Sequence, residues 1–334
     1  LLDSASPRPR HMLQPVFMND DVSFDISVII PVYNVEKYLK DCLDSVVSQS
    51  VDGTYEVIIV NDGSTDNSGK VIKEYCTSNH FVKYLYQQNA GAPAARNNGL
   101  EHAAGEYVIF FDADDLLFPN ALKNMLHSMT INSADVVMGN YDEIDEQGHF
   151  LRKMNQRDCV VGLDKNWQFV LCAPLPGNKL FKKTFLNSHG IKFEPLKIGQ
   201  DLNLYLKILA IAKIVLLDQE VMGYRIVQGS ISRQYSLKIL DICNSIDNVK
   251  EYYATLGKTN DYKKYISIAE LIAYRSQLAK IRFFTSEDQK NKIIEVLGRR
   301  IRKSYLPSKV LLKTYLKERI KCSIILCMTF FNLY

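Results

Sequence analysis

Several common sequence patterns are missing from this 334-residue chain, and each absence argues against one class of protein or one kind of site. The seven cysteines are scattered without a C-x-x-C pair, which argues against a zinc site and indicates core thiols in a reducing compartment. No apolar run reaches the roughly 17–25 residues that a membrane-spanning helix needs, and no secretory signal peptide is recognisable. No G-x-G-x-x-G follows the first predicted strand and no G-x-x-x-x-G-K-S/T occurs, which excludes a dinucleotide-binding fold and a P-loop.

Positive charge is concentrated at the C-terminal end. The net charge is +4, but residues 290–334 carry eleven Lys and Arg against two Glu, which leaves the preceding part acidic. Basic and apolar residues alternate at helical spacing in 299–303 and 310–321, and an apolar segment, 324–334, follows. Such a helix either lies on an anionic membrane surface or packs on the rest of the protein or on a second subunit. The sequence leaves both interpretations open, and with them the oligomeric state.

Strand-like and helix-like segments alternate through the first half of the chain. Apolar β-branched runs predict buried strands, and apolar residues three and four apart predict amphipathic helices. This alternation indicates an α/β protein with a parallel sheet whose ligands bind at the carboxyl ends of the strands. The predicted strands are 26–30, where Pro31 is expected to break the first one, 56–60, 82–86 and 107–111, with helices at 35–48 and 89–104.

The second half is predicted to complete a main domain and to add a helical region. The main domain is expected to span 22–235 and the helical C-terminal region 236–334, with a disordered linker in 1–21. The remaining predicted elements are a strand at 135–141, a hairpin turn at 146–149, a short helix around Trp167, a helix from Gln200 and strands at 214–217 and 221–227.

Three carboxylates follow the strand that begins at Tyr107. Carboxylates at the end of a buried strand are costly unless a cation neutralises them, and period-2 spacing turns Asp112 and Asp114 to the same side. Their oxygen ligands favour Mg²⁺ or Mn²⁺, ions that usually bring phosphates with them. The alternative is an acidic turn that caps the next helix, in which Pro119 takes an early position.

Six motifs in order resemble the family-2 glycosyltransferases with the GT-A fold. The motifs extend over some two hundred residues, and the last hundred residues lie outside the resemblance. It implies an α/β GT-A catalytic domain, a mostly parallel sheet flanked by helices, followed by the C-terminal helical region. The motifs are 27–34 (SVIIPVYN), 60–66 (VNDGSTD), 89–97, 111–115 (FDADD), Gln200-Asp201 and 224–232.

The implied activity is transfer of a hexose or N-acetylhexosamine from a UDP-sugar to a hydroxyl, with inversion. The acceptor would be a glycan or a lipid-linked molecule in bacterial cell-surface polysaccharide synthesis. The enzyme would work in the cytoplasm, at the inner face of the membrane, and no nucleic-acid partner is expected. Two other classes compete: nucleotidyl transfer, disfavoured because no Gly-rich, Arg/Lys-bearing loop follows the first strand, and a non-catalytic module that binds a sugar nucleotide or glycan.

By the same resemblance, the D-x-D motif maps onto Asp112 and Asp114. Asp114 would bind Mn²⁺ or Mg²⁺ directly, and Asp112 would face the ribose or a metal-bound water. No His follows His189, so phosphates and water would complete the coordination. Asp115 is expected either to take part or to form a salt bridge with Arg96.

The nucleotide-sugar site is likewise implied. Tyr33 and Asp62 would hold the uracil base, but a strand-end core aromatic and a simple turn former are the alternatives for them. The segment that closes over the diphosphate would begin near Arg225. The full implied set is Pro31, Tyr33, Asn34, Asp62, Asn89, Gly91, Arg96, Asp112, Ala113, Arg225, Ser230 and Ser232.

On the acceptor side, Asp201 is the implied catalytic base. A general base must remove the proton of the attacking hydroxyl, and the neighbouring Gln200 cannot titrate. The alternative for Asp201 is a plain helix cap. Asn178, Lys179 and Gln200 are expected to line the acceptor side, unless Lys179 is only a solvated charge.

Overall fold

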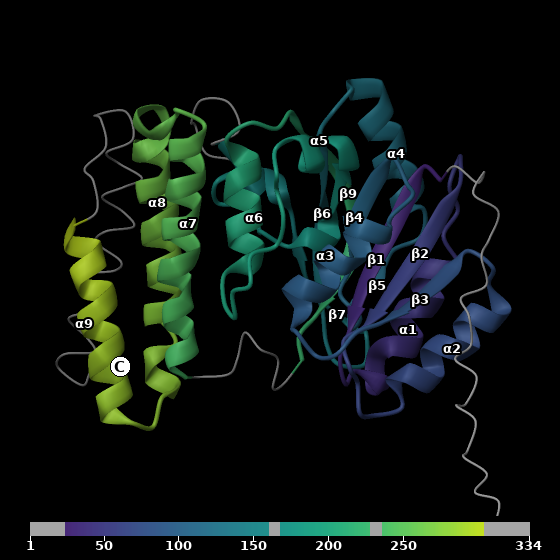
Figure 1. Ribbon diagram of the computed structural model, residues 1–334, viewed down its shortest axis with the longest axis horizontal. Coiled ribbons are helices and arrows are strands. Elements are labelled where there is room, and N and C mark those ends of the chain that lie inside the picture. Colours follow the sequence, from purple (N-terminus) through teal and green to yellow (C-terminus); the bar gives the residue numbers. More distant parts are fainter. Residues whose placement is uncertain (1–23, 160–167, 228–235, 304–334) are drawn as a thin grey trace, which may run out of the picture.

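The computed structural model describes residues 24–159, 168–227 and 236–303. A nine-stranded sheet forms its centre, helices cover both faces, and a group of three helices packs beyond one face (Figure 1). The strands are β1 (Ile26–Val32), β2 (Tyr55–Asn61), β3 (Val82–Tyr86), β4 (Tyr107–Phe110), β5 (Leu116–Leu117), β6 (Val136–Ile144), β7 (Phe150–Met154), β8 (Lys179–Lys182) and β9 (Ile214–Arg225). The helices are α1 (Glu36–Val47), α2 (Ser68–Ser78), α3 (Ala92–His102), α4 (Ala121–Asn132), α5 (Lys183–Ser188), α6 (Gln200–Leu209), α7 (Asp241–Thr255), α8 (Thr259–Leu278) and α9 (Glu287–Lys303).

The sheet has the order β3-β2-β1-β4-β8-β6-β9-β5, and β7 pairs with β6. Strands β3, β2, β1 and β4 are parallel, so their carboxyl ends meet at one edge. Strand β8 is antiparallel to both of its neighbours, whereas β6 and β9 are parallel. The predicted α/β class is confirmed, but the sheet is mixed rather than mostly parallel, because β8 reverses the chain direction in its middle.

Apolar side chains divide into one core on each face of the sheet. On one face, Leu39 and Leu43 of α1 and Leu122 of α4 pack against the strands. On the other, Leu100 of α3 and Ile208 of α6 do so. The loops after β1, β2 and β4 therefore emerge between two helical layers, at the edge where the sequence placed the ligand site.

Helix α6 belongs to two cores. Leu204 and Ile208 face the sheet, while Tyr205 and Leu209 join a third cluster with the interior faces of α7, α8 and α9. In Figure 1, α6 lies between the sheet and α7. The predicted C-terminal helical region is confirmed as far as residue 303.

Other predictions concern residues that the structure does not describe. The linker at 1–21, the helix around Trp167 and the basic segment 310–334 lie outside the described residues. The domain boundary near residue 235 stays a prediction. No helix in the described ranges is long and apolar enough to cross a membrane.

Two predicted strand limits are wrong. Strand β1 continues through Pro31 to Val32 along β2. The backbone of Pro31 faces β4, but pairing with β4 ends at Ile29. The missing N–H of Pro31 therefore interrupts no hydrogen-bond ladder. The two strands predicted between 214 and 227 form the single strand β9, which pairs along β6 with a shift of register near Asn140.

Candidate active site

The acidic turn after β4 is the centre of the site. Strand β4 is buried throughout, and the N–H of Phe111 still donates to the Ile29 carbonyl of β1. The chain then turns, with the Asp115 N–H donating to the Asp112 carbonyl at 3.2 Å. Asp112 and Asp114 remain partly exposed, whereas Asp115 is buried.

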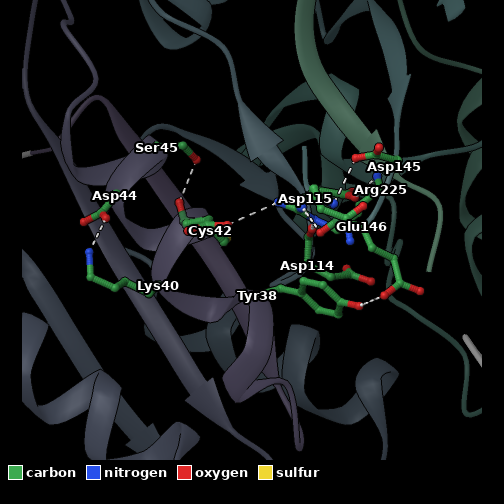
Figure 2. A network of polar contacts seen from close by, with 12 residues as sticks. Tyr38, Lys40, Cys42, Asp44, Ser45, Asp114, Asp115, Asp145, Glu146 and Arg225 are labelled. Atoms are coloured by element: carbon green, nitrogen blue, oxygen red, sulfur yellow. Dashed lines mark hydrogen bonds and ion pairs between the residues drawn. The ribbon is translucent and has the colours of Figure 1, made fainter. Parts of the chain in front are cut away.

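Asp115 fixes this turn to strand β9. Its Oδ1 accepts the backbone N–H of Arg225 at 2.8 Å, and the Arg225 Nε donates to the Asp114 carbonyl at 2.6 Å. Burial, with the charges of Asp114 and Asp112, raises the pKa of Asp115 well above its usual range. The expected salt bridge between Asp115 and Arg96 is therefore wrong, and Asp115 supports the turn from beneath (Figure 2).

Arg96 instead joins two other carboxylates. Its Nη2 lies 2.5 Å from Asp112 Oδ1 and its Nη1 lies 3.1 Å from Asp201 Oδ1, while only 4% of its side chain is exposed. The guanidinium stacks over the ring of Phe193 at 4.9 Å. One buried cation thus draws together the acidic turn of β4 and the start of α6.

Asp201 lies in the first turn of α6 and does not cap that helix. Gly199, in the left-handed conformation, occupies the N-cap of α6, and no side chain caps that end. Asp201 Oδ1 accepts from Arg96, and no described residue donates to Oδ2. Desolvation, only partly offset by Arg96, raises the pKa of Asp201 to about 6. The helix-cap alternative is wrong.

Asp114 has the properties of a cation ligand. Desolvation and the neighbouring Asp112 raise its pKa to about 6, so its charge is incompletely compensated by the protein. Within the described ranges no cluster of three His, Cys, Asp or Glu could hold a metal. A divalent ion would fit here with Asp114 as ligand, assisted by Asp112, and with phosphate or water oxygens filling the other positions.

Tyr33 extends from the carboxyl end of β1 and is 51% exposed, so the core-aromatic alternative is wrong. Tyr86, at the end of β3, is 66% exposed and was not singled out from the sequence. Strand β2 separates the two strands, so both residues lie at the carboxyl-end edge of the parallel strands. The only available signal for Tyr86 was its position as the last residue of a predicted strand.

Asp62 organises the neighbouring loop. It is buried, and its carboxylate accepts from Gln87 Nε2 and from the backbone N–H groups of Ala90 and Gly91 at 2.7–2.8 Å. These contacts hold Asn89 exposed at the start of α3. A contact with a nucleotide base stays a prediction for Asp62.

Asn34 fastens the loop after β1 to the loop after β2. Its Oδ1 accepts the Thr65 N–H at 2.8 Å, and its own N–H donates to Ser64 Oγ. Asn34 adopts φ 48, a left-handed conformation that Asn tolerates. Pro31 is partly exposed and Ala113 is buried, and Ser230 and Ser232 are outside the described residues.

Lys179 and Asn178, where strand β8 begins, are buried. Lys179 Nζ donates to the carbonyls of Ala173 and Leu175 and to Asn178 Oδ1 at 2.7–2.8 Å, and burial lowers its pKa to about 7. Asn178 Nδ2 donates to the Gly139 carbonyl. The solvated-charge alternative for Lys179 is wrong. An acceptor contact by either side chain stays a prediction, as it does for Gln200.

Glu146, at the tip of the β6–β7 hairpin, contacts helix α1 and Arg225 of β9. Its carboxylate contacts Lys37 Nζ at 2.5 Å and accepts from the Tyr38 hydroxyl at 3.0 Å, and its carbonyl accepts from Arg225 Nη1 (Figure 2). The sequence predicted the hairpin but gave no sign that its tip returns to α1.

Comparisons with known proteins identify the family. Residues 27–192 match the family described as Glycosyl transferase family 2. The chain is 30% identical over 300 residues to glycosyltransferase GlyG of Streptococcus pneumoniae serotype 4, covering 80% of this chain and 98% of that protein. It is 33% identical over 226 residues to glycosyltransferase GlyA of the same organism, covering 64% of this chain but only 32% of the relative's length.

A solved structure has the same fold. The crystal structure of S. aureus TarS 1–349 in complex with UDP-GlcNAc superposes with a TM-score of 0.57 at 18% identity, covering 92% of each chain. The family match, the GlyG relationship and this fold agree, and the chain belongs to the family-2 glycosyltransferases with the GT-A fold.

Proposed function

We propose that this enzyme transfers a hexose or an N-acetylhexosamine from a UDP-sugar to a hydroxyl of a glycan or lipid-linked acceptor, with inversion. The observation that carries the proposal is the contact of Arg96 with both Asp112 and Asp201. This contact brings the acidic turn, which would bind the donor, close to Asp201, whose Oδ2 accepts from no described residue. The UDP-GlcNAc in the structurally similar TarS supports a UDP-sugar as donor.

The donor would bind between the loops after β1, β2 and β4. The exposed ring of Tyr33 offers a stacking surface for uracil, and the neighbouring loop is held by Asp62. Asp114, assisted by Asp112, would hold Mn²⁺ or Mg²⁺, an ion that offsets the charge developing on the leaving diphosphate.

Asp201 acts as the general base. Its Oδ1 is held by Arg96, which leaves Oδ2 to accept the proton of the attacking hydroxyl. The hydroxyl oxygen forms a bond to the anomeric carbon as the bond to the UDP oxygen breaks, and this single in-line displacement inverts the anomeric configuration. A pKa near 6 leaves Asp201 ionised at neutral pH yet a better base than an ordinary aspartate.

Product analysis tests the proposal. Incubation with UDP-Glc, UDP-Gal and their N-acetyl forms, Mn²⁺ and a bacterial polysaccharide acceptor should yield free UDP and a glycoside of opposite anomeric configuration. A thermal-shift screen of the four donors selects the sugar. A new nucleotide-sugar would establish nucleotidyl transfer instead, and binding without any product would establish a non-catalytic module.

A further inference from the structure

The start of α6 is fastened to one side of α7. Four hydrogen bonds join the segment 197–203, which carries Asp201, to α7 residues at positions 241, 245 and 248. Positions spaced by four and three residues lie on one side of a helix. The C-terminal helical group therefore reaches to within two residues of the proposed base.

Each contact has good hydrogen-bond geometry. Asp241 Oδ2 accepts the Lys197 N–H at 2.7 Å, and Ser245 Oγ donates to the Gly199 carbonyl at 2.8 Å. Asn203 Nδ2 donates to the Ser245 carbonyl at 2.9 Å. Asn203 also donates to Asn248 Oδ1 at 3.0 Å, and both Asn203 and Ser245 are fully buried.

These contacts hold a helix end that no side chain caps. The first turn of α6 has Gly199 at its N-cap and no capping side chain, so the orientation of this turn depends on tertiary contacts. Gly199 has φ 83, and a Cβ there would approach Ile242 Cδ1 of α7 to 2.7 Å. The positive φ and the close approach of α7 together favour glycine at this position.

We infer that α7 holds Asp201 in its catalytic position through Asp241 and Ser245, which makes these two residues positioning residues for transfer. The inference rests on the proposed role of Asp201. Arg96 holds the carboxylate from the sheet side, and α7 holds the backbone that carries it from the opposite side. Displacement of a reacting group by about 1 Å can cost roughly a hundredfold in rate.

Ser245→Ala and Asp241→Ala test the inference, with UDP release from the preferred UDP-sugar as the assay. We expect kcat to fall roughly ten- to a hundredfold, while donor KM and the Mn²⁺-dependent affinity for UDP stay unchanged. Asp241→Asn keeps an accepting oxygen and should restore most of the rate. Ser267→Ala is the matched control, because Ser267 is buried in α8 and donates only within its own helix.

Loss of UDP affinity in parallel with kcat would overturn the inference, since it would show general damage to the fold. Unchanged kcat in both alanine variants, or an Asp241→Asn variant as slow as Asp241→Ala, would also overturn it. If Ser245→Ala fails to fold, the comparison of Asp241→Ala with Asp241→Asn tests the inference by itself. Failure of the proposed function is recognised separately, by normal turnover in Asp201→Asn.

Discussion

The Nη1 atom of Arg96 lies 3.1 Å from Asp201 Oδ1, although 105 residues separate the two in the chain. The same guanidinium binds Asp112, so one cation contacts both carboxylates. Because Arg96 stabilises the ionised form of Asp201, it keeps the pKa of that carboxyl near 6 against the opposing effect of burial.

Arg96→Met should therefore move the acid limb of the kcat/KM profile to higher pH. In the free enzyme with saturating Mn²⁺, activity should rise with pH through a midpoint near 6, as Asp201 loses its proton. Without Arg96 the pKa of Asp201 rises further, so most activity should be lost at pH 6.5 and partly recovered at pH 8.5. Arg96→Lys retains a positive charge, so the midpoint of the acid limb should move less in this variant. An unchanged midpoint would show that another group controls the acid limb.

Asp114→Ala should abolish metal-dependent UDP binding. Its carboxylate is the partly exposed acid that the protein leaves incompletely compensated. Calorimetry of UDP with and without Mn²⁺ measures the effect. Asp115→Asn is the control: the pKa of Asp115 is raised well above its usual range, and an Asn oxygen can still accept the Arg225 N–H, so binding should persist. Equal loss in both variants would count against Asp114 as a specific ligand.

Lys179→Met should destabilise the fold by about 2–5 kcal/mol. The change leaves the buried Asn178 Oδ1 and the partly buried carbonyls of Ala173 and Leu175 without this donor, and a buried unsatisfied acceptor costs about 1–3 kcal/mol. Urea unfolding measures the difference. Lys183→Met removes a single donor, to the Ala103 carbonyl, at a half-buried position, and should cost less than about 1 kcal/mol. Similar values for both variants would refute a special role of Lys179.

Deletion of residues 304–334 should weaken binding to anionic vesicles and leave UDP binding intact. This segment carries five Lys and Arg and one Glu among apolar residues. The cut follows Lys303 because Arg300 of α9 forms a bidentate pair with Asp247 of α7 and must be retained. Sedimentation with phosphatidylserine-containing vesicles at low and high salt measures attachment. If the full-length protein stays in the supernatant at low salt, the membrane interpretation is wrong. The alternative, that the segment packs on the rest of the protein or on a second subunit, then remains.

Much of the fold could be predicted because its strands are continuous apolar runs bounded by turn residues. Strands β2, β3 and β4 and helix α1 lie where periodicity placed them, and the acidic turn follows β4 as expected. Reversal of the chain at β8 could not be predicted, since a short apolar strand carries no signal for its direction.

Within the site, residue types were easier to predict than partners. Arg96 was expected beside Asp115 but binds Asp112 and Asp201, because the choice among nearby carboxylates depends on how α3 and α6 approach the turn. A lysine next to a Pro- and Gly-containing segment is normally solvated, so the burial of Lys179 could not be predicted from the sequence. The contact of Glu146 with Tyr38 spans 108 residues and arises only in the folded chain.

The most direct test of the account is the turnover of Asp201→Asn. Asparagine preserves the size of the side chain and an oxygen that can accept from Arg96, so melting temperature and Mn²⁺-dependent UDP affinity should change little. Because asparagine cannot accept the proton of the acceptor hydroxyl, UDP release from the preferred UDP-sugar should fall by roughly a hundred- to ten-thousandfold. A stable variant with near-normal UDP release would contradict the assignment of Asp201 as the base.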